Sequence, residues 1–242
     1  MAISALTDVE LWFAQYRLST DHNQLGLEIG YDENDDTVFQ DTARSITGGL
    51  AFTRLVGSGF VTIGNGNVHE VLRSNVNVAN VPVTVSPDGG DDGDYAEFFL
   101  SKTLSYQTLG QVGQIMPFTF NAHGQGTPSI KGTILGVGSK ASTANGTARQ
   151  LGAVSATQRL YAALHVISVS GVSPTLDVVI ASDNASNFPS GTTRITFAQK
   201  TAAGHEWLSV AGAITDDWWR AQWTIGGSSS PTFDVVIVAG IF

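Results

Sequence analysis

Acidic side chains form two dense clusters, and carboxylates so close together are the natural ligands of a hard cation. One cluster lies within residues 32–36 and the other within residues 88–97. Carboxylate oxygens in a flexible loop suit Ca²⁺. Neither cluster has the glycine and the distant glutamate of an EF-hand loop at the required spacing. We therefore interpret both clusters as solvated turns or as repulsive surface charge, and we predict no metal site.

Histidine and serine show no spacing typical of a catalytic or metal site. No two histidines have the i, i+4 or His-x-His separation of metal ligands: they are His22, His69, His123, His165 and His205. His165 lies in an apolar strand pattern, so we expect a hydrogen-bonded core residue. The sequence has no Gly-x-Ser-x-Gly motif and no glycine-rich loop with the lysine of a phosphate site. We predict that the chain is not an enzyme and uses no cofactor.

One predicted strand contains three tryptophans and an arginine, which are side chains that can bind a ligand. Trp219 and Trp223 share one face of this strand, and Trp218 and Arg220 share the other. An exposed Trp beside an Arg is a common platform for sugars. We favour structural packing for the cluster, with Trp219 in a core. Trp218 and Arg220 remain candidates for a surface that binds a ligand.

The composition favours a β protein that buries much of its surface against other chains. Only 14% of the 242 residues are charged, against roughly 25% in an ordinary soluble domain. The 27 glycines, together with many Val, Thr and Ser, favour strands and turns. A net charge of −9 argues against a protein that grips nucleic acid phosphates. We expect no secretory signal, no disulfide and no membrane span.

Alternation of apolar and polar residues with a period of two is the dominant signal along the chain. It predicts strands over 11–18, 25–29, 50–63, 81–85, 98–106, 116–121, 129–135, 159–169, 175–181, 192–198, 206–210, 218–225 and 232–241. One helix is expected over 67–74, because Val68, Val71 and Leu72 share a helical face and Asn67 can cap the first turn. The predicted fold class is all-β with one short helix.

The polar stretch over residues 32–49 is longer than an ordinary connection in a compact domain. It contains apolar anchors, so we predict an arm that contacts another subunit and pairs Arg44 with a neighbour's acidic residue. The candidate arm residues are Asp32, Asp35, Asp36, Phe39, Asp41, Arg44 and Ile46. Small residues over 139–150 predict a linker. It would separate a first domain at 1–138 from a second β-sandwich domain at 151–242.

Several stretches carry a resemblance to a known family. In the first half they are Val-Glu-Leu-Trp-Phe at 9–13, the arm segments 37–39 and 41–44, Gly-Gly-Leu at 48–50, and residues 81–90 and 113–118. This half resembles the tube domain of the major tail proteins of long-tailed bacteriophages. Residues 214–227 and 230–236 look like part of a β-sandwich found in phage virion proteins.

The resemblance implies a tail-tube β-sandwich or half-barrel with one flanking helix. It also implies homo-hexameric rings, stacked into a hollow channel through which DNA passes during ejection without specific binding. The implied partners are further copies and other tail proteins, namely the tape measure, the tail terminator and the distal tail protein, with assembly in the host cytoplasm and a final location in the virion. Independently of the family, ring closure removes the unpaired edges of open sheets, and we expect a polar, acidic face toward the lumen. The alternatives are a carbohydrate-binding virion protein and a capsid-decoration protein.

Overall fold

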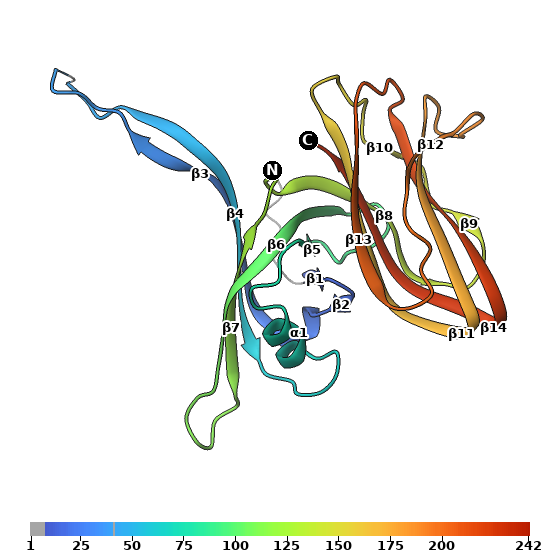
Figure 1. Cartoon of the computed structure of the whole chain (residues 1–242), viewed down its shortest axis with the longest axis horizontal. Helices are drawn as coiled ribbons and strands as arrows, with labels where there is room; N and C mark the ends of the chain where they lie inside the picture. The colour runs from blue at the N-terminus through green and yellow to red at the C-terminus, as the bar shows by residue number, and fades with distance from the viewer. Residues whose placement is uncertain (1–7, 41) are drawn as a thin grey trace. The chain divides into compact units, whose positions relative to one another are not determined.

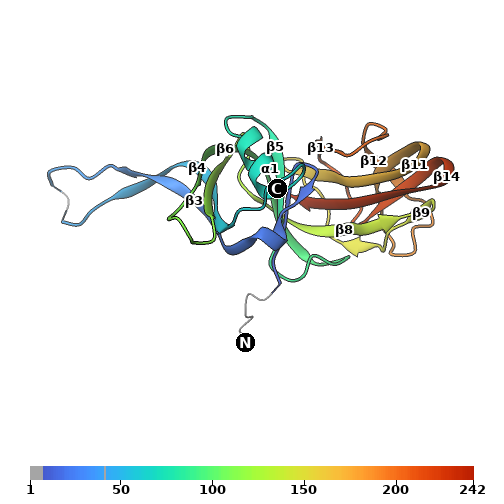
Figure 2. The same cartoon turned by 90° about the horizontal axis from the view of Figure 1, so that it is seen from below.

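The computed structural model describes residues 8–40 and 42–242. Contacts between residues divide the chain into two compact units. Unit 1 comprises the described part of Met1–Thr20 together with Pro82–Phe98 and Ile130–Phe242, and unit 2 comprises Asp21–Val81 and Phe99–Ser129. Strands dominate both units (Figures 1 and 2), and the helix α1 (Val68–Ser74) is the one α-helix in the described part of the chain. The predicted fold class, all-β with one short helix, is confirmed.

Unit 1 is built from antiparallel strands around two long ones. These are β11 (Arg159–Asp183) and β14 (Trp218–Ile241), which pair with each other along most of their length. Its other strands are β1 (Glu10–Phe13), β2 (Tyr16–Arg17), β5 (Val81–Ser86), the start of β6 (Tyr95–Thr108), β8 (Ile130–Lys140), β9 (Ala144–Asn145), β10 (Arg149–Gln150), β12 (Thr192–Thr196) and β13 (Gly204–Ala211).

The long strands fold back on themselves, so that each contributes to both layers of a sandwich. The ladder between them shifts register around Ser170–Thr175, where Gly171 and Gly227 adopt positive φ angles of 106° and 118°. Glycine tolerates this backbone conformation, which permits the bend. One hydrophobic core accordingly includes Leu164 and Leu176 from the two halves of β11, and Trp219 and Phe233 from the two halves of β14.

The outer face of one layer carries a second core. Tyr161 and Ala163 of β11 lie there with Trp12 and Phe98 from strands near the N-terminus. His165 is fully buried on this side: its Nδ1 donates to the carbonyl of Ala14 at 2.5 Å, and its Nε2 accepts from the Thr84 hydroxyl at 2.8 Å. The layer therefore curls until β5 and the β1–β2 turn lie against β11, which gives a half-barrel. The expectation of a hydrogen-bonded core histidine is confirmed.

Unit 2 is a four-stranded antiparallel sheet in the order β3-β4-β7-β6. Its strands are β3 (His22–Asp35), β4 (Ile46–Phe60), β7 (Pro117–Gly124) and the later part of β6. One face buries Leu55 and Phe120, and the three apolar residues of α1 are also buried. A hydrogen bond of 2.9 Å between His69 Nδ1 and the Tyr106 hydroxyl ties α1 to β6. The predicted helix is thus confirmed, although the Asn67 side chain donates to the Ile63 carbonyl and does not cap the helix.

Three local expectations were wrong in detail. The strand expected over 11–18 is a tight hairpin of β1 and β2, because Ala14 adopts a positive φ of 55°. The stretch over 32–49 was expected to be a long connection between strands, but its two ends continue β3 and β4. The paired strands expected within 159–181 and within 218–241 are each one continuous, bent strand.

The two compact units do not follow the sequence boundaries expected at 138 and 151. β8 ends at Lys140 and pairs with β14, and β9 and β10, within the stretch expected to be a linker, also pair with β14. Strands from before residue 100 share a core with β11 and β14. Small side chains over 139–150 therefore serve close strand packing. Within the described residues, no helix is long and apolar enough to cross a membrane.

Candidate assembly surface

The second face of the unit 2 sheet is exposed or half-exposed, and it combines polar rows with exposed apolar residues of β4, namely Leu50, Val56 and Phe60. Strand pairing places Glu28, Arg54, His123 and Lys102 side by side in one row across all four strands. The next row on this face consists of Gly26, Val56, Asn121 and Ser105, and the row after it consists of Gln24, Ser58, Thr119 and Gln107. Arg54 Nε donates to Oδ1 of the Asn121 side chain at 3.2 Å. One carboxylate against two basic side chains makes these rows nearly balanced in charge, so the expected acidic character is absent from them.

The two outer strands of this sheet have edges that no further described strand fully occupies. Among the described strands, β3 (14 residues) pairs only with β4, so no second strand lies along its far side. On the far side of the later part of β6, Thr103 forms an isolated bridge with Val76, and its carbonyl accepts from the Asn77 amide at 2.8 Å. Exposed strand edges present unpaired N–H and C=O groups that invite pairing with another chain. The sheet is therefore open along β3 and partly open along β6.

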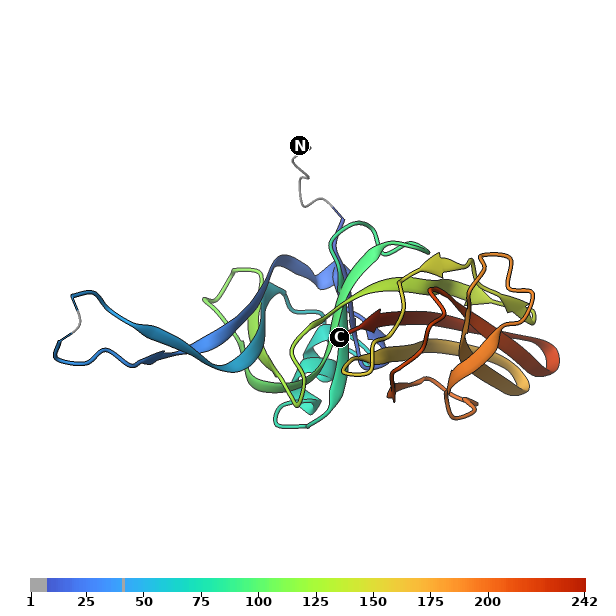
Figure 3. The same cartoon turned by 90° about the horizontal axis from the view of Figure 1, so that it is seen from above.

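The β3–β4 hairpin, blue in Figure 3, ends in a tip. Its own polar side chains brace this tip: Asp35 accepts hydrogen bonds from the Thr37 amide at 3.1 Å and from Arg44 Nε at 3.1 Å. Asp36 accepts from the Thr47 hydroxyl at 2.5 Å. Hydrogen bonds, from Thr37 to Asp35 and from Thr47 to Asp36, lower the pKa of both carboxyl groups. The partner of Arg44 is thus found in its own hairpin, where the sequence interpretation expected a neighbouring subunit.

Apolar side chains on this tip are exposed to solvent. Phe39 is 110% exposed and Val38 is 64% exposed, and Ile46 at the base of the tip is 48% exposed. Asp32 is exposed on β3. Asp41, the remaining candidate arm residue, lies outside the described residues. A phenyl ring with its whole surface in water is costly, because burial of a Phe side chain is worth roughly 1.5–3 kcal/mol. The tip therefore has the character of a contact surface.

A second apolar tip, which the sequence interpretation missed, lies in the turn between β6 and β7. Leu109, Val112 and Ile115 are 75%, 105% and 71% exposed. The pairing of Phe60 with Pro117 places this turn beside the end of β4, whereas the first tip precedes Ile46 at the start of β4. The two tips therefore project from opposite ends of one sheet (Figure 1). The sequence could have indicated this tip, because Leu, Val and Ile are separated there by Gly and Gln, which are typical of an exposed turn.

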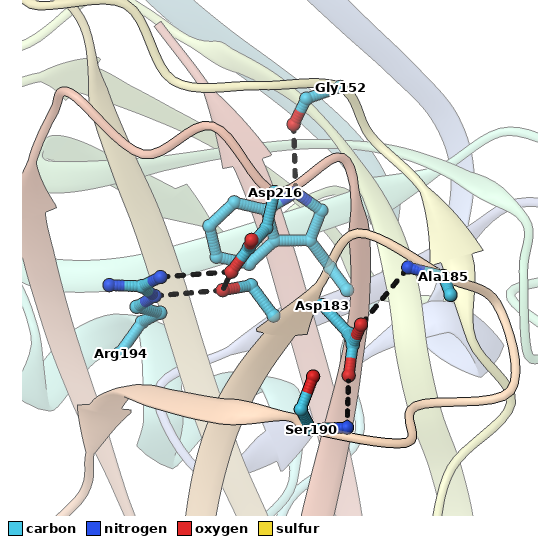
Figure 4. A network of polar contacts seen from close by, with 8 residues as sticks. Gly152, Asp183, Ala185, Ser190, Arg194 and Asp216 are labelled. Atoms are coloured by element: carbon cyan, nitrogen blue, oxygen red, sulfur yellow. Dashed lines mark hydrogen bonds and ion pairs between the residues drawn. The ribbon is translucent and has the colours of Figure 1, made fainter.

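The tryptophan cluster of unit 1 is largely structural. Trp219 is fully buried, as expected, and its indole N–H donates to the Gly152 carbonyl at 2.8 Å (Figure 4). The guanidinium of Arg220 lies 4.1 Å from the centre of the Phe188 ring. Trp218 is half-buried. The aromatic partner of Arg220 is thus Phe188, and Trp218 and Arg220 stay candidates for a binding surface.

A polar network beside this cluster holds strands and a loop together. Asp183 is 2% exposed and accepts from the backbone amides of Ala185 at 3.1 Å and Ser190 at 2.8 Å. Nearby, Asp216 accepts from the Ser182 hydroxyl at 2.6 Å and from Arg194 at 2.9 Å. These two bonds, that of Ser182 first, lower the pKa of Asp216.

This network has the character of a brace between strands. Ser182 also accepts from Arg194 Nε at 2.8 Å, so its hydroxyl is fixed between a carboxylate and a cation (Figure 4). A nucleophilic serine needs an adjacent base that takes its proton and must be free to approach a substrate. The Ser182 hydroxyl is instead held between Asp216 and Arg194, which fits a structural role. Among the residues that the structure describes, no group of three or more His, Cys, Asp or Glu is placed to hold a metal ion.

Comparisons with known proteins add structural likenesses. No protein-family model matches the chain, and no curated protein sequence matches it. The chain is similar to the SPP1 tail tube, with 13% identity and a TM-score of 0.42 over 51% of this chain and 76% of that one. It is similar to a protein of the native gene transfer agent virion, with 12% identity and a TM-score of 0.40 over 50% of this chain and 93% of that one.

A third likeness spans almost the whole chain. The SPP1 Dit protein, described as a hub of the adsorption apparatus in phages that infect Gram-positive hosts, aligns over 98% of this chain and 100% of its own, with 9% identity and a TM-score of 0.37. The similar structures thus include tail tube and tail hub proteins of phages and phage-like particles. With TM-scores below 0.5, these likenesses do not establish a function for this chain.

Proposed function

We propose that this chain is a structural subunit of a phage tail tube, which assembles into closed, hexameric rings that stack into a hollow channel for DNA. The observation that supports this most directly is the unit 2 sheet. One of its faces is buried and the other is exposed and carries polar rows beside apolar residues of β4. Among the described strands, β3 pairs only with β4, and the far side of the later part of β6 is only partly occupied. A sheet of this kind is suited to join identical sheets around a closed barrel.

Edge pairing is the proposed source of ring closure. The outer edge of β3 in one copy pairs with the outer edge of β6 in the next copy. Such a contact is heterologous, because it uses two different surfaces of the same chain. It closes into a ring when the rotation from one copy to the next is a whole fraction of a full turn. Closure satisfies the backbone groups of both edges and leaves no strand available for aggregation.

The exposed face is the proposed lining of the channel. Its central row combines Glu28 with Arg54 and Lys102, so a passing phosphate backbone meets neither a strongly basic nor a strongly acidic surface. Strong binding of DNA requires many uncompensated Lys and Arg contacts. A lining with small net charge lets DNA pass without being held. The face packed on α1 points away from the channel in this arrangement.

The remaining assignments follow from this role. The finished assembly is part of the virion and is formed in the host cytoplasm. Its partners are further copies of the chain and other tail proteins at the two ends and inside the channel. The bent sandwich of unit 1 decorates the tube.

Electron microscopy of the purified chain tests this proposal, because rings and hollow tubes of uniform width are expected. Ile29→Lys places a charge on the free strand β3 and should abolish rings while circular dichroism stays unchanged. Val172→Lys is the matched control, since Val172 is also an exposed apolar residue in a strand, 56% against 51% for Ile29. Compact monomers or trimers from the unmodified chain would overturn the tube assignment and favour a decoration protein.

A further inference from the structure

We infer that the two apolar tips of unit 2 are the two halves of one contact between successive rings. The tip of the β3–β4 hairpin, with Val38 and Phe39, packs on the β6–β7 turn of a copy in the next ring, with Leu109, Val112 and Ile115. This inference rests on the proposed ring assembly. It names the surface that each tip recognises, which is a different surface of the same chain.

Geometry excludes a contact between the two tips of one chain. They project from opposite ends of the sheet, and β4 alone, with 15 residues, spans roughly 50 Å at 3.3 Å per residue. Copies displaced along the strand direction bring the first tip of one copy toward the second tip of the next. The contact is therefore head-to-tail, and it repeats without limit along the axis.

Charge favours this pairing over a contact between two hairpin tips. Residues 32–36 of the hairpin include four carboxylates, and Arg44 pairs with one of them. Two such hairpins in contact would bring like charges together. Residues 109–116 contain no charged side chain. The β6–β7 turn therefore accepts the acidic hairpin without repulsion.

The size of the contact indicates how assembly proceeds. Five apolar side chains, at roughly 100 Å² each, bury about 500 Å². A stable complex of two proteins usually buries about 1,200–2,000 Å². One contact therefore cannot hold two free chains together, whereas several formed at once between two rings can. Rings must form first, and stacking follows cooperatively.

Two blocked variants test the pairing. Phe39→Asp disables the hairpin tip and Val112→Asp disables the turn, so each alone should form rings that do not stack. A mixture of the two retains one functional pair of surfaces: the hairpins of Val112→Asp rings and the turns of Phe39→Asp rings. Electron microscopy of the mixture should show stacks of two rings and no longer tubes. Val172→Asp, the control in unit 1, should form normal tubes.

The outcomes separate the inference from the proposed function. Normal tubes from Val112→Asp would overturn the inference, because the hairpin would then dock elsewhere, and the ring proposal would stand. A mixture in which no two-ring stacks form would overturn it as well. Absence of rings from the unmodified chain would overturn the proposed function itself.

Discussion

At the residue scale, the structure separates side chains that brace the chain from side chains that face outward. The sequence predicted the hairpin acids as contact residues, yet Asp35 and Asp36 bond to neighbours in their own hairpin. Phe39 was predicted as an anchor for another subunit, and its complete exposure is consistent with that role. The bracing could not be foreseen, because it depends on which residues face each other across a turn whose register the sequence does not specify.

His165 predicts a dependence of stability on pH. Burial is the main reason that its pKa is lowered from 6.5 to about 4, and the nearby His205 lowers it further. Burial, and then Lys200, also lowers the pKa of His205. Because the folded chain binds the proton of His165 less tightly than the unfolded chain, this stabilisation is complete above about pH 6.5. It is lost as the pH falls toward 4, by about 3 kcal/mol in total.

Urea unfolding at several pH values, with and without His165→Gln, measures the contribution of His165 to the free energy of unfolding. The Phe39→Asp variant is used as the background, because its rings are not expected to stack. The free energy of unfolding should fall between pH 6.5 and 4 by clearly more when His165 is present. Equal slopes for the two proteins would show that His165 is not the group responsible.

Asp183 predicts a local loss of stability. Its buried carboxylate is an acceptor for two backbone amides of the loop over 184–190. Removal of the acceptor in Asp183→Ala leaves both amides without this partner, at a cost of about 1–3 kcal/mol. Thermal unfolding should show this decrease, and Asp183→Asn, which keeps an acceptor oxygen, should recover part of it. An unchanged melting temperature for Asp183→Ala would contradict the assignment.

At the scale of elements, the sequence predicted the positions of most strands and of the helix but not their bends and pairings. Period-two alternation reports which residues face a core, and it reports this equally for a straight strand and for each half of a bent one. The bends in β11 and β14 depend on single positive-φ residues such as Gly171 and Gly227. Glycine is common enough in this chain that the sequence alone could not show which glycines bend a strand.

Gly59 in β4 tests how closely the strands of unit 2 approach. A Cβ atom at this position would lie 1.9 Å from the backbone oxygen of Asp21, which cannot move aside as a flexible side chain can. We expect Gly59→Ala to destabilise the chain by about 1–3 kcal/mol. Gly204→Ala in β13 is the control, because no atom outside Gly204 and its two chain neighbours lies within 4 Å of its Cβ position. Chemical denaturation compares the two, and equal midpoints would contradict the close approach.

At the scale of the whole molecule, the chain passes repeatedly between its two units, and a boundary drawn along the sequence does not separate them. The sequence suggested two successive domains because composition changes near residue 139. The structure shows why this change misleads: the small residues lie in and between strands that pack on β14. Contacts between distant parts of a chain leave no mark on local composition.

A fragment of residues 139–242 should therefore fold poorly. It loses most of β8 and the early part of β6, and so exposes the core side chains Tyr161 and Val238 of the half-barrel. We expect the fragment to aggregate or to bind a hydrophobic dye strongly, whereas the full chain does not. A soluble fragment with a sharp, cooperative thermal transition would contradict this expectation and would support a boundary near 139.

Two unlike tips at opposite ends of one sheet also give any filament of these rings a direction. One terminus would display acidic hairpins that end in phenylalanine, and the other would display uncharged loops of Leu, Val and Ile. No single capping protein could fit both termini, and the repeating contact itself does not limit the number of rings in a filament. Length and the distinction between the two termini would have to come from other components, each matched to one of these chemistries.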